Sequence, residues 1–315
     1  MDVSVVLCTY NRCDLLPGAI ASLLDQDTDD VAYEVLVVDN NSTDRTREVV
    51  ESFVEGDHAP VRYLFELQQG LSFARNAGIR AARGSIVAFT DDDVRVSRTW
   101  VRDVKRAFDA NPGVDCVGGK VLPRWHRAPP RWLTPRNWSP LALVDHGDAR
   151  FRTNLDRRVC LVGANLAVRR EAFDDVGLFA AEFQRVADNV GTTEDGEFQE
   201  RLWRAGREGL YDPAVVVTAD VQDERMTRAY HRRWHREHGR YIAMMRLGQW
   251  EKPGPRLSGV PLALYVWGLK SVVDLLRDGP RGPAERFELE LKLRFLSGYS
   301  AQRRADSKGG VPAAR

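Results

Sequence analysis

The alternation of two sequence patterns over the first hundred residues constrains the fold more than any other feature. Short apolar runs rich in β-branched residues predict strands, and stretches with an apolar residue every three to four positions predict amphipathic helices between them. The expected strands span Val3 to Cys8, Tyr33 to Asp39, Val61 to Phe65 and Ser85 to Thr90. Repeated βα units form a mostly parallel sheet covered by helices on both faces, so the sequence predicts the α/β class.

Composition narrows the class of protein. The chain has 315 residues, 43% of them hydrophobic, which is enough for one large α/β unit with an appendage or for two domains. Its 46 Lys and Arg nearly balance its 45 Asp and Glu, which argues against a dedicated nucleic-acid binder. The four cysteines form no CxxC pair, which argues against a zinc ribbon or a disulfide framework and favours a reducing cytoplasm.

Neither a secretion signal nor a membrane span is expected. The N-terminus begins with a strand-like run and has no basic segment followed by a long apolar one. The longest uncharged apolar stretch, Val260 to Leu269, is shorter than the roughly 20 residues that a spanning helix needs. We therefore expect a cytoplasmic protein.

Polar residues follow three of the expected strands. They are Thr9-Tyr10-Asn11-Arg12, Asp39-Asn40-Asn41 and Asp91-Asp92-Asp93. Ligands of open α/β sheets bind at the carboxyl ends of the strands, so these loops are expected to meet in one binding site.

The three consecutive aspartates favour a metal site. Neighbouring carboxylates repel one another unless a cation relieves them, and Mg²⁺ or Mn²⁺ prefers oxygen ligands. A solvated acidic turn is the alternative. The position directly after the apolar run Ile86 to Phe89 favours the metal.

Glu194 and Asp195 form a second acidic pair at the expected start of a helix. Such carboxylates can simply compensate the helix dipole. Together with a metal loop, one of them can instead act as the base that activates an incoming hydroxyl.

Five segments in this order resemble the inverting, non-processive glycosyltransferases of family 2, which have the GT-A fold. The resemblance covers roughly residues 1 to 245. The segments are Val5 to Arg12, Val37 to Asp44, Gly70 to Gly78, Phe89 to Asp93, and Glu194-Asp195. The resemblance implies a GT-A glycosyltransferase domain over 1–245 and a C-terminal helical extension over 246–315.

The resemblance also implies a nucleotide site. Thr9, Tyr10 and Asn11 would lie along the base and ribose, and Asp39 would accept a hydrogen bond from the base. A UDP-sugar is favoured, and a dTDP- or GDP-sugar also fits. Arg75 would lie near the nucleotide; the alternative is an arginine on a helix surface.

The roles at the reaction centre follow from the same resemblance. Asp91 would face the ribose, and Asp93, with Asp92 as a second candidate, would bind Mg²⁺ or Mn²⁺ on the diphosphate. Asp195 would be the general base of a single displacement that inverts the anomeric carbon.

Four further residues are candidates for contact with the donor sugar or the acceptor. Gly163 and Asn165 belong to a small-residue stretch that resembles the border of the donor sugar, and Glu194 precedes the expected base. Trp132 lies in the Trp- and Pro-rich segment Pro123 to Pro140, which we expect to be an irregular acceptor or lid loop. The alternatives are a turn before a buried strand for Gly163 and loop-anchoring tryptophans for the segment.

The sequence departs from the family pattern in two places. Many relatives have a histidine, a further metal ligand, where this chain has Val217 to Asp220. Asp220 or one of His231, His235 and His238 could replace it, although these histidines are more typical of a solvated basic helix face. The QxxRW element of polymerising relatives is incomplete, which indicates transfer of a single sugar.

The C-terminal segment suggests a surface helix. The amphipathic stretch Leu262 to Leu276, with the arginines of 225–240, could rest on an anionic membrane and approach a lipid-linked acceptor. A helical cap packed on the catalytic domain is the alternative. For the alternating residues Phe287 to Phe295 we expect a helix, because Glu, Leu, Lys and Arg favour it.

The sequence thus predicts an inverting, metal-dependent transferase that moves one sugar to a saccharide or lipid-linked acceptor, in synthesis of cell-envelope or extracellular polysaccharide. A sugar-1-phosphate nucleotidylyltransferase is a rival, but it would need a glycine-rich loop where this chain has Thr9-Tyr10-Asn11. A catalytically silent sugar-nucleotide binding module is the non-enzyme rival.

Overall fold

The computed structural model describes residues 1–54, 60–184, 189–247, 249–251, 253–276 and 282–308. The chain forms two compact units. The sheet unit comprises Met1–His126, Ala142–Ala187 and Glu194–Val221, and the helical unit comprises Arg127–Leu141, Asp188–Thr193 and Gln222–Arg315. The expected boundary lies after residue 245. In the structure, the helix Arg228–Met245 already belongs to the helical unit, so the two units divide earlier in the chain.

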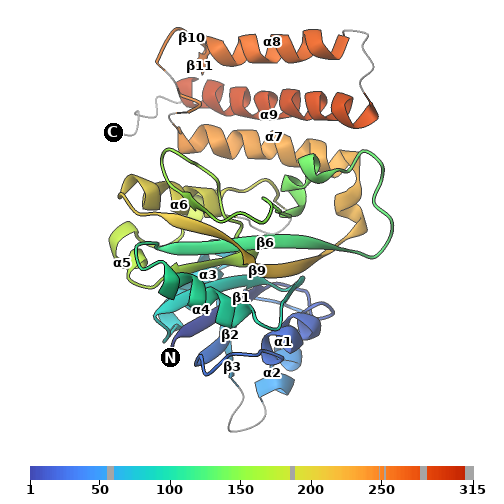
Figure 1. Ribbon diagram of the computed structural model, residues 1–315. Coiled ribbons are helices and arrows are strands. Elements are labelled where there is room, and N and C mark those ends of the chain that lie inside the picture. The colour runs from blue at the N-terminus through green and yellow to red at the C-terminus, as the bar shows by residue number, and fades with distance from the viewer. Residues whose placement is uncertain (55–59, 185–188, 248, 252, 277–281, 309–315) are drawn as a thin grey trace. The chain divides into compact units, whose positions relative to one another are not determined.

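The sheet unit is built on one mixed sheet, in which the described residues form nine strands. Eight follow the order β3-β2-β1-β4-β8-β6-β9-β5, and β7 pairs with β9. The strands β1 to β4 are parallel neighbours, β8 is antiparallel to both β4 and β6, and β6 and β9 lie side by side in parallel (Figure 1). Their bounds are β1 Val3–Thr9, β2 Tyr33–Asp39, β3 Val61–Phe65, β4 Ile86–Asp91, β5 Val94–Val96, β6 Cys116–Trp125, β7 Phe151–Thr153, β8 Leu166–Arg169 and β9 Gly209–Val221.

Helices cover both faces of this sheet. All seven residues of β1 are buried, so apolar side chains on its two faces are equally shielded from water. One face packs with α3, α5 and α6 into a core that includes Val6, Phe89 and Phe198. The helices are α1 Leu16–Leu24, α2 Thr46–Val54, α3 Leu71–Ala81, α4 Trp100–Ala110, α5 Ala172–Val176 and α6 Glu194–Arg204, with short 3₁₀ helices η3 Gly163–Asn165 and η4 Ala181–Phe183.

Among its described residues, the helical unit is a stack of three α-helices. In Figure 1, α9 lies between α7 and α8, and it packs against both. Glycines let α7 and α9 approach closely, since a Cβ on Gly298 would lie 1.8 Å from the carbonyl oxygen of Arg236. The elements are α7 Arg228–Met245, α8 Leu262–Leu276, α9 Pro283–Lys308, the hairpin β10 Arg256–Leu257 and β11 Val260–Pro261, and the 3₁₀ helices η1 Pro135–Asn137, η2 Ser139–Leu141 and η5 Asp223–Met226.

Most of the expected elements are confirmed. The strands at Tyr33–Asp39 and Val61–Phe65 have the predicted bounds, and Phe287 to Phe295 lie in a helix. The expectation of an irregular segment from Pro123 to Pro140 is wrong in part, because β6 continues through Pro123 to Trp125. No helix within the described ranges is long and apolar enough to cross a membrane.

Candidate active site

The loops after β1 and β2 interlock through hydrogen bonds. The backbone N–H of Asn11 donates to Ser42 Oγ at 2.9 Å, and the Asn11 side-chain oxygen accepts from the N–H of Thr43 at 2.7 Å. Asn11 has a φ of 51°, a left-handed conformation that asparagine tolerates better than most residues. Tyr10 is 36% exposed at the rim of this loop. The two loops are therefore fixed to each other and form one wall of the site at the carboxyl edge of the sheet.

Asp39 is the buried centre of this wall. It is 2% exposed, one carboxylate oxygen accepts from the N–H of Ser42 at 2.9 Å, and the other accepts from the Tyr63 hydroxyl at 2.8 Å. Burial and this bond to Asp39 raise the pKa of Tyr63. Each carboxylate oxygen retains a second lone pair, so Asp39 can still accept from a ligand.

Asp91 is the last residue of β4, and Asp92 and Asp93 form the turn between β4 and β5. Asp92 and Asp93 are each 7% exposed, which excludes the solvated turn. Arg12 Nη1 lies 2.9 Å from Asp93 Oδ2 and 3.4 Å from Asp92 Oδ1, and the hydroxyl of Thr9 donates to Asp92 at 2.9 Å. Burial raises the pKa of Asp92 to about 7 despite the opposing effect of Arg12, and Asp93 and Asp91 add to the increase.

The Asp92–Asp93 pair fits a divalent cation that brings other ligands with it. Among the described residues, no group of three or more His, Cys, Asp or Glu side chains is assembled to hold a metal alone. The guanidinium of Arg12 shows, however, that the two carboxylates draw a cation between them. Mg²⁺ typically takes one or two carboxylates and completes its shell with water and phosphate oxygens.

Arg75 and Asp195 form a second charged centre. Arg75, on α3, is 3% exposed, which excludes an arginine on the helix surface. Its Nη1 lies 2.5 Å from Asp195 Oδ1 and 3.6 Å from Glu194 Oε1, both in the first turn of α6. Burial alone would lower the pKa of Arg75, but Asp195 and Glu194 raise it above its ordinary value. The structure thus places Arg75 on the acidic pair.

Asp195 is held from two sides and is still accessible. The backbone N–H of Gly163 donates to Asp195 Oδ2 at 2.8 Å, and the Asp195 side chain is 22% exposed. A Cβ on Gly163 would lie 2.3 Å from Arg75 Nη2 and 2.6 Å from Asp195 Oδ1, so a larger residue here would have to displace one of these two side chains. The carboxylate is therefore fixed in orientation and can receive a proton from a molecule in solution.

Asn165 and Trp132, two candidates for contact with the sugar or the acceptor, make hydrogen bonds or ring contacts within the protein. Asn165 is 1% exposed; its amide donates to the carbonyl oxygens of Lys120 and Val215 and accepts from Trp100 Nε1 at 2.8 Å. These bonds tie η3 to β6, β9 and α4. Trp132 belongs to the helical unit, where its ring contacts His231 and Phe287 at centroid distances of 4.9 and 4.8 Å.

Asp220, one candidate for the missing metal ligand, is held by two arginines and a histidine. Its carboxylate, 4% exposed, is bonded by Arg95, Arg124 and, at 3.0 Å, His126 Nε2. Burial would raise the pKa of Asp220, but the two arginines hold it below its usual value. The backbone N–H of Asp220 donates to the Asp93 carbonyl at 2.8 Å. Asp220 therefore supports the aspartate turn through its backbone.

The expectation of a solvated histidine face on α7 is wrong. His231 is fully buried among aromatic rings, and burial lowers its pKa to about 4. His238 is half-buried, and its Nδ1–H donates to the Gly191 carbonyl at 3.2 Å. These histidines face the interior of the helical unit because α7 is packed against α9.

Sequence reasoning missed three residues of these clusters. The sequence places Arg12 in the first loop and assigns it no role, although it directly follows the expected ligands Thr9, Tyr10 and Asn11. Arg124 and His126 lie at the end of β6, in the segment expected to be irregular, so no pattern linked them to Asp220. One signal could have pointed to such residues. The acidic residues at the strand ends outnumber the basic ones there, so a nearby cationic side chain was needed to balance their charge.

Comparison with known proteins finds glycosyltransferases. The sequence model described as "Glycosyl transferase family 2" matches residues 4–177. Glucosyl-dolichyl phosphate glucuronosyltransferase of Haloferax volcanii is 27% identical over 190 residues, which cover 60% of this chain and 59% of that protein. Glycosyltransferase AglE of the same organism is 31% identical over 178 residues, 56% of this chain and 55% of the relative. The matches thus span little more than half of these curated relatives.

The fold is shared with a solved structure. The mannosyltransferase PcManGT from Pyrobaculum calidifontis, solved in complex with GDP-Man and Mn²⁺, matches 99% of this chain and 76% of its own chain with a TM-score of 0.55. Sequence identity is 20%, so this likeness concerns the fold.

Proposed function

The chain belongs to glycosyl transferase family 2 and has the GT-A fold, and on that premise we propose that it is an inverting, metal-dependent glycosyltransferase. It would transfer a single sugar from a nucleotide-diphosphate donor to a hydroxyl of the acceptor. The observation that carries the proposal is the accessible carboxylate of Asp195, fixed by Arg75 and by the Gly163 N–H in the same unit as the buried Asp92–Asp93 pair.

Asp195 is the proposed general base. Its carboxylate would take the proton from the acceptor hydroxyl while that oxygen attacks the anomeric carbon from the face opposite the diphosphate. The new C–O bond forms as the bond to the diphosphate breaks, so the anomeric configuration inverts. Arg75 and Gly163 keep the carboxylate oriented, which favours attack at one hydroxyl.

The loops after β1 and β2 are the proposed nucleotide site. Asp39 would accept the ring N–H of the base, and Thr9, Tyr10 and Asn11 would flank the base and ribose, with Asp91 facing the ribose hydroxyls. Uracil, thymine and guanine all offer a ring N–H, and we favour a UDP-sugar.

Asp93, with Asp92, would hold Mg²⁺ or Mn²⁺ against the diphosphate. When bound, the ion stabilises the negative charge that develops on the leaving nucleoside diphosphate. Arg12, which contacts both carboxylates, would move toward phosphate oxygens when the ion takes its place.

The acceptor is proposed to be a saccharide or a lipid-linked saccharide in cell-envelope or extracellular polysaccharide synthesis. Glucosyl-dolichyl phosphate, in the name of one relative, is a lipid-linked sugar, which supports this class. The protein would act on the cytoplasmic side of the membrane.

Replacing Asp195 with Asn tests the base. Asparagine keeps the size of the side chain but cannot take a proton, so transfer should fall by about 10²- to 10⁴-fold while donor affinity changes little. Release of nucleoside diphosphate with a panel of donors measures the rate, and calorimetry measures donor affinity. Asp148→Asn, at an exposed aspartate, is the matched control. Full activity in Asp195→Asn would remove the residue from this role, and donor binding without turnover by the native protein would favour a silent binding module.

Calorimetry with Mn²⁺ and UDP tests the metal. If Asp93 holds the ion together with a bound diphosphate, Mn²⁺ and UDP should each increase the affinity for the other by the same factor, about tenfold or more. Asp93→Ala should abolish this mutual increase. Independent binding of Mn²⁺ and UDP to the native protein would contradict a shared site.

A further inference from the structure

Helix α8 exposes one continuous apolar face. Five large apolar residues recur along it at intervals of three or four, so they form a stripe on one side of the helix. Their exposed fractions run from 39% to 74%, and the stripe comprises Leu262, Val266, Leu269, Val273 and Leu276. An aligned row of this kind differs from the scattered apolar residues that any surface carries.

The opposite side of α8 holds the helix in the helical unit. Leu264 and Ser271 are buried there, and a Cβ on Gly268 would lie 2.8 Å from Leu296 of α9. The stripe is therefore not the face by which α8 packs into the protein. Replacing its residues leaves the contact with α9 in place.

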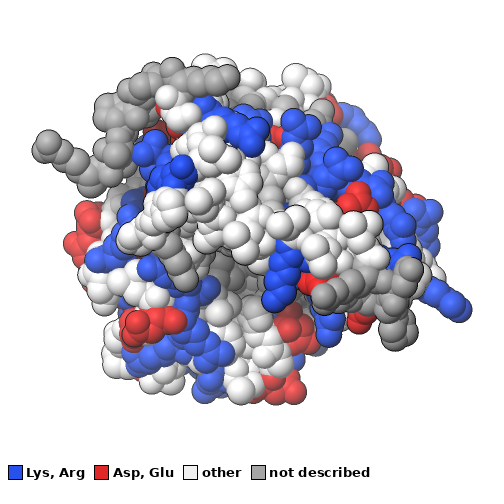
Figure 2. Space-filling view, turned by 90° about the horizontal axis from the view of Figure 1, so that it is seen from above, with Lys and Arg blue, Asp and Glu red and all other residues white. Residues whose placement is uncertain are grey.

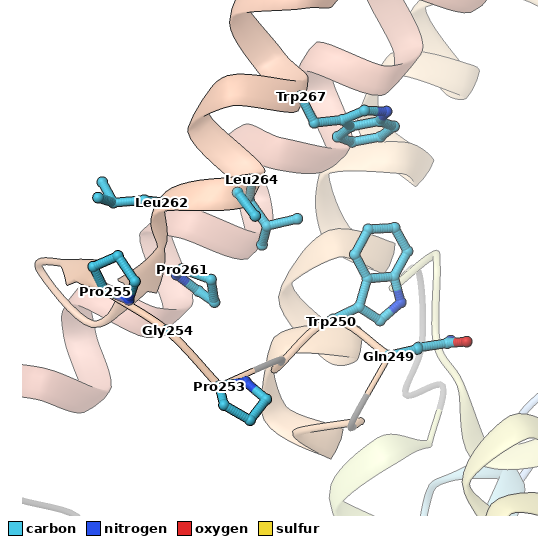
Figure 3. Close-up of a pocket in the computed structure, with 10 residues that line it drawn as sticks. Gln249, Trp250, Pro253, Gly254, Pro255, Pro261, Leu262, Leu264 and Trp267 are labelled. Atoms are coloured by element: carbon cyan, nitrogen blue, oxygen red, sulfur yellow. The ribbon is translucent and has the colours of Figure 1, made fainter.

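An apolar pocket continues the stripe at its N-terminal end. It has a volume of about 390 Å³ and lies between the segment around Trp250 and the start of α8 (Figure 3). Leu262 belongs both to the stripe and to the lining, and Trp267 and Trp250 form other walls. Indole rings are favoured where an apolar phase meets water.

The part of the chain that contains α8 is basic. Residues 222–315 contain 19 Lys and Arg but only 10 Asp and Glu, and the rest of the chain carries the compensating excess of acid. Lys270 is exposed on α8, and Arg304 of α9 donates to the Tyr265 hydroxyl of α8. Figure 2 shows an uncharged area with Lys and Arg at its border.

We propose that α8 docks on an anionic lipid bilayer, with the stripe among the headgroups and the adjoining pocket holding part of an acyl chain. An apolar face beside basic residues is the arrangement that binds such a surface. The helix has 15 residues, about 22 Å, which is too short to span the hydrocarbon core, so it lies in the plane of the surface. The inference rests on the helical unit and does not depend on the proposed transferase activity.

Vesicle sedimentation of the full chain tests the proposal. Wild-type protein should bind vesicles of phosphatidylcholine with about one third phosphatidylglycerol, and binding should weaken with salt and on phosphatidylcholine alone. The double variant Val266→Asp/Leu269→Asp should bind at least about tenfold more weakly, because it places two anions in the stripe. Leu67→Asp/Leu155→Asp is the matched control, since it adds the same charge at two exposed leucines of the sheet unit and should bind as wild type.

Two further measurements test the docking of α8 even if the double variant folds poorly. Val266→Trp adds interfacial apolar area at the same position and should tighten binding. Vesicles with brominated acyl chains should quench tryptophan fluorescence, and less so in Trp267→Phe if an acyl chain enters the pocket.

Several results would overturn the proposal. Wild-type protein that stays in solution with anionic vesicles would do so, as would equal binding by the stripe variant and its control. A wild-type dimer in light scattering that the stripe variant converts to a monomer, with no vesicle binding by either, would assign the face to a second copy of the chain. None of these results would bear on sugar transfer, which is measured with soluble donors.

Discussion

Gly163 determines how the proposed base is held. Its N–H donates to Asp195, and the space beyond its Cα is filled by the Arg75 guanidinium and the Asp195 carboxylate. The residue therefore acts through its small size as well as through its backbone.

Gly163→Ala should reduce both the rate of transfer and the stability of the fold. The added methyl group must displace Arg75 or Asp195, so we expect transfer to fall about tenfold to a hundredfold, with a loss of about 1 to 3 kcal/mol in the free energy of unfolding. Steady-state kinetics and urea unfolding measure the two effects. Gly113→Ala is the control, because the nearest atom to its new Cβ lies 3.9 Å away. Native kinetics in Gly163→Ala would show that the pair tolerates displacement.

The buried carboxyl of Asp92 should make the metal-free protein sensitive to pH. Its folded pKa, about 7, lies above the usual value of 3.8. Stability from the neutral form is therefore complete below pH 4 and is lost as the pH rises through 7. Asp92→Asn removes this loss, so at pH 8 the variant should be more stable than wild type by about 2 to 4 kcal/mol, and nearly equal at pH 4. Urea unfolding at both pH values in the presence of a chelator measures the difference, and an equal difference at both would exclude Asp92 as its source.

At the scale of elements, continuous apolar runs were enough to predict the parallel half of the sheet. Strands such as Tyr33–Asp39 are buried on both faces, so their sequence is distinctive by itself. The other half of the sheet, which contains the antiparallel pairs and the parallel pair β6–β9, is built from partners far apart in the chain, and β8 has only four residues between β4 and β6. Such pairing depends on long-range contacts that leave no local pattern, and for this reason Arg124, His126 and Asp220 could not be joined from the sequence.

The packing of α7 on α9 depends on small residues, and Gly298→Ala tests this. A Cβ there would lie 1.8 Å from the Arg236 carbonyl, so the helices must separate, at a cost of about 1 to 3 kcal/mol in the stability of the helical unit. Thermal unfolding followed by circular dichroism measures it. Ser297→Ala, at the adjacent exposed position of α9, should leave the transition unchanged. Equal transitions in the two variants would show that the helices do not approach as closely as described.

At the scale of the whole molecule, near-neutrality conceals two opposite charges. Residues 1–221 contain 27 Lys and Arg and 35 Asp and Glu, whereas residues 222–315 are basic. The formal net charge of +1 is correct for the whole chain, but it does not show that one part is acidic and the other basic. Similarly, the tryptophan-rich segment could be recognised from composition, but its assignment to the helical unit required the contacts of Trp132 with His231 and Phe287.

The interleaving of the two units affects how the protein is made. Residues 127–141 leave the ribosome well before Phe287, which packs against Trp132 and is translated about 150 residues later. During that interval the nascent chain must keep the Trp132 ring away from other apolar surfaces. A premature stop codon before α9 would therefore yield a chain in which Trp132 lacks its contact with Phe287.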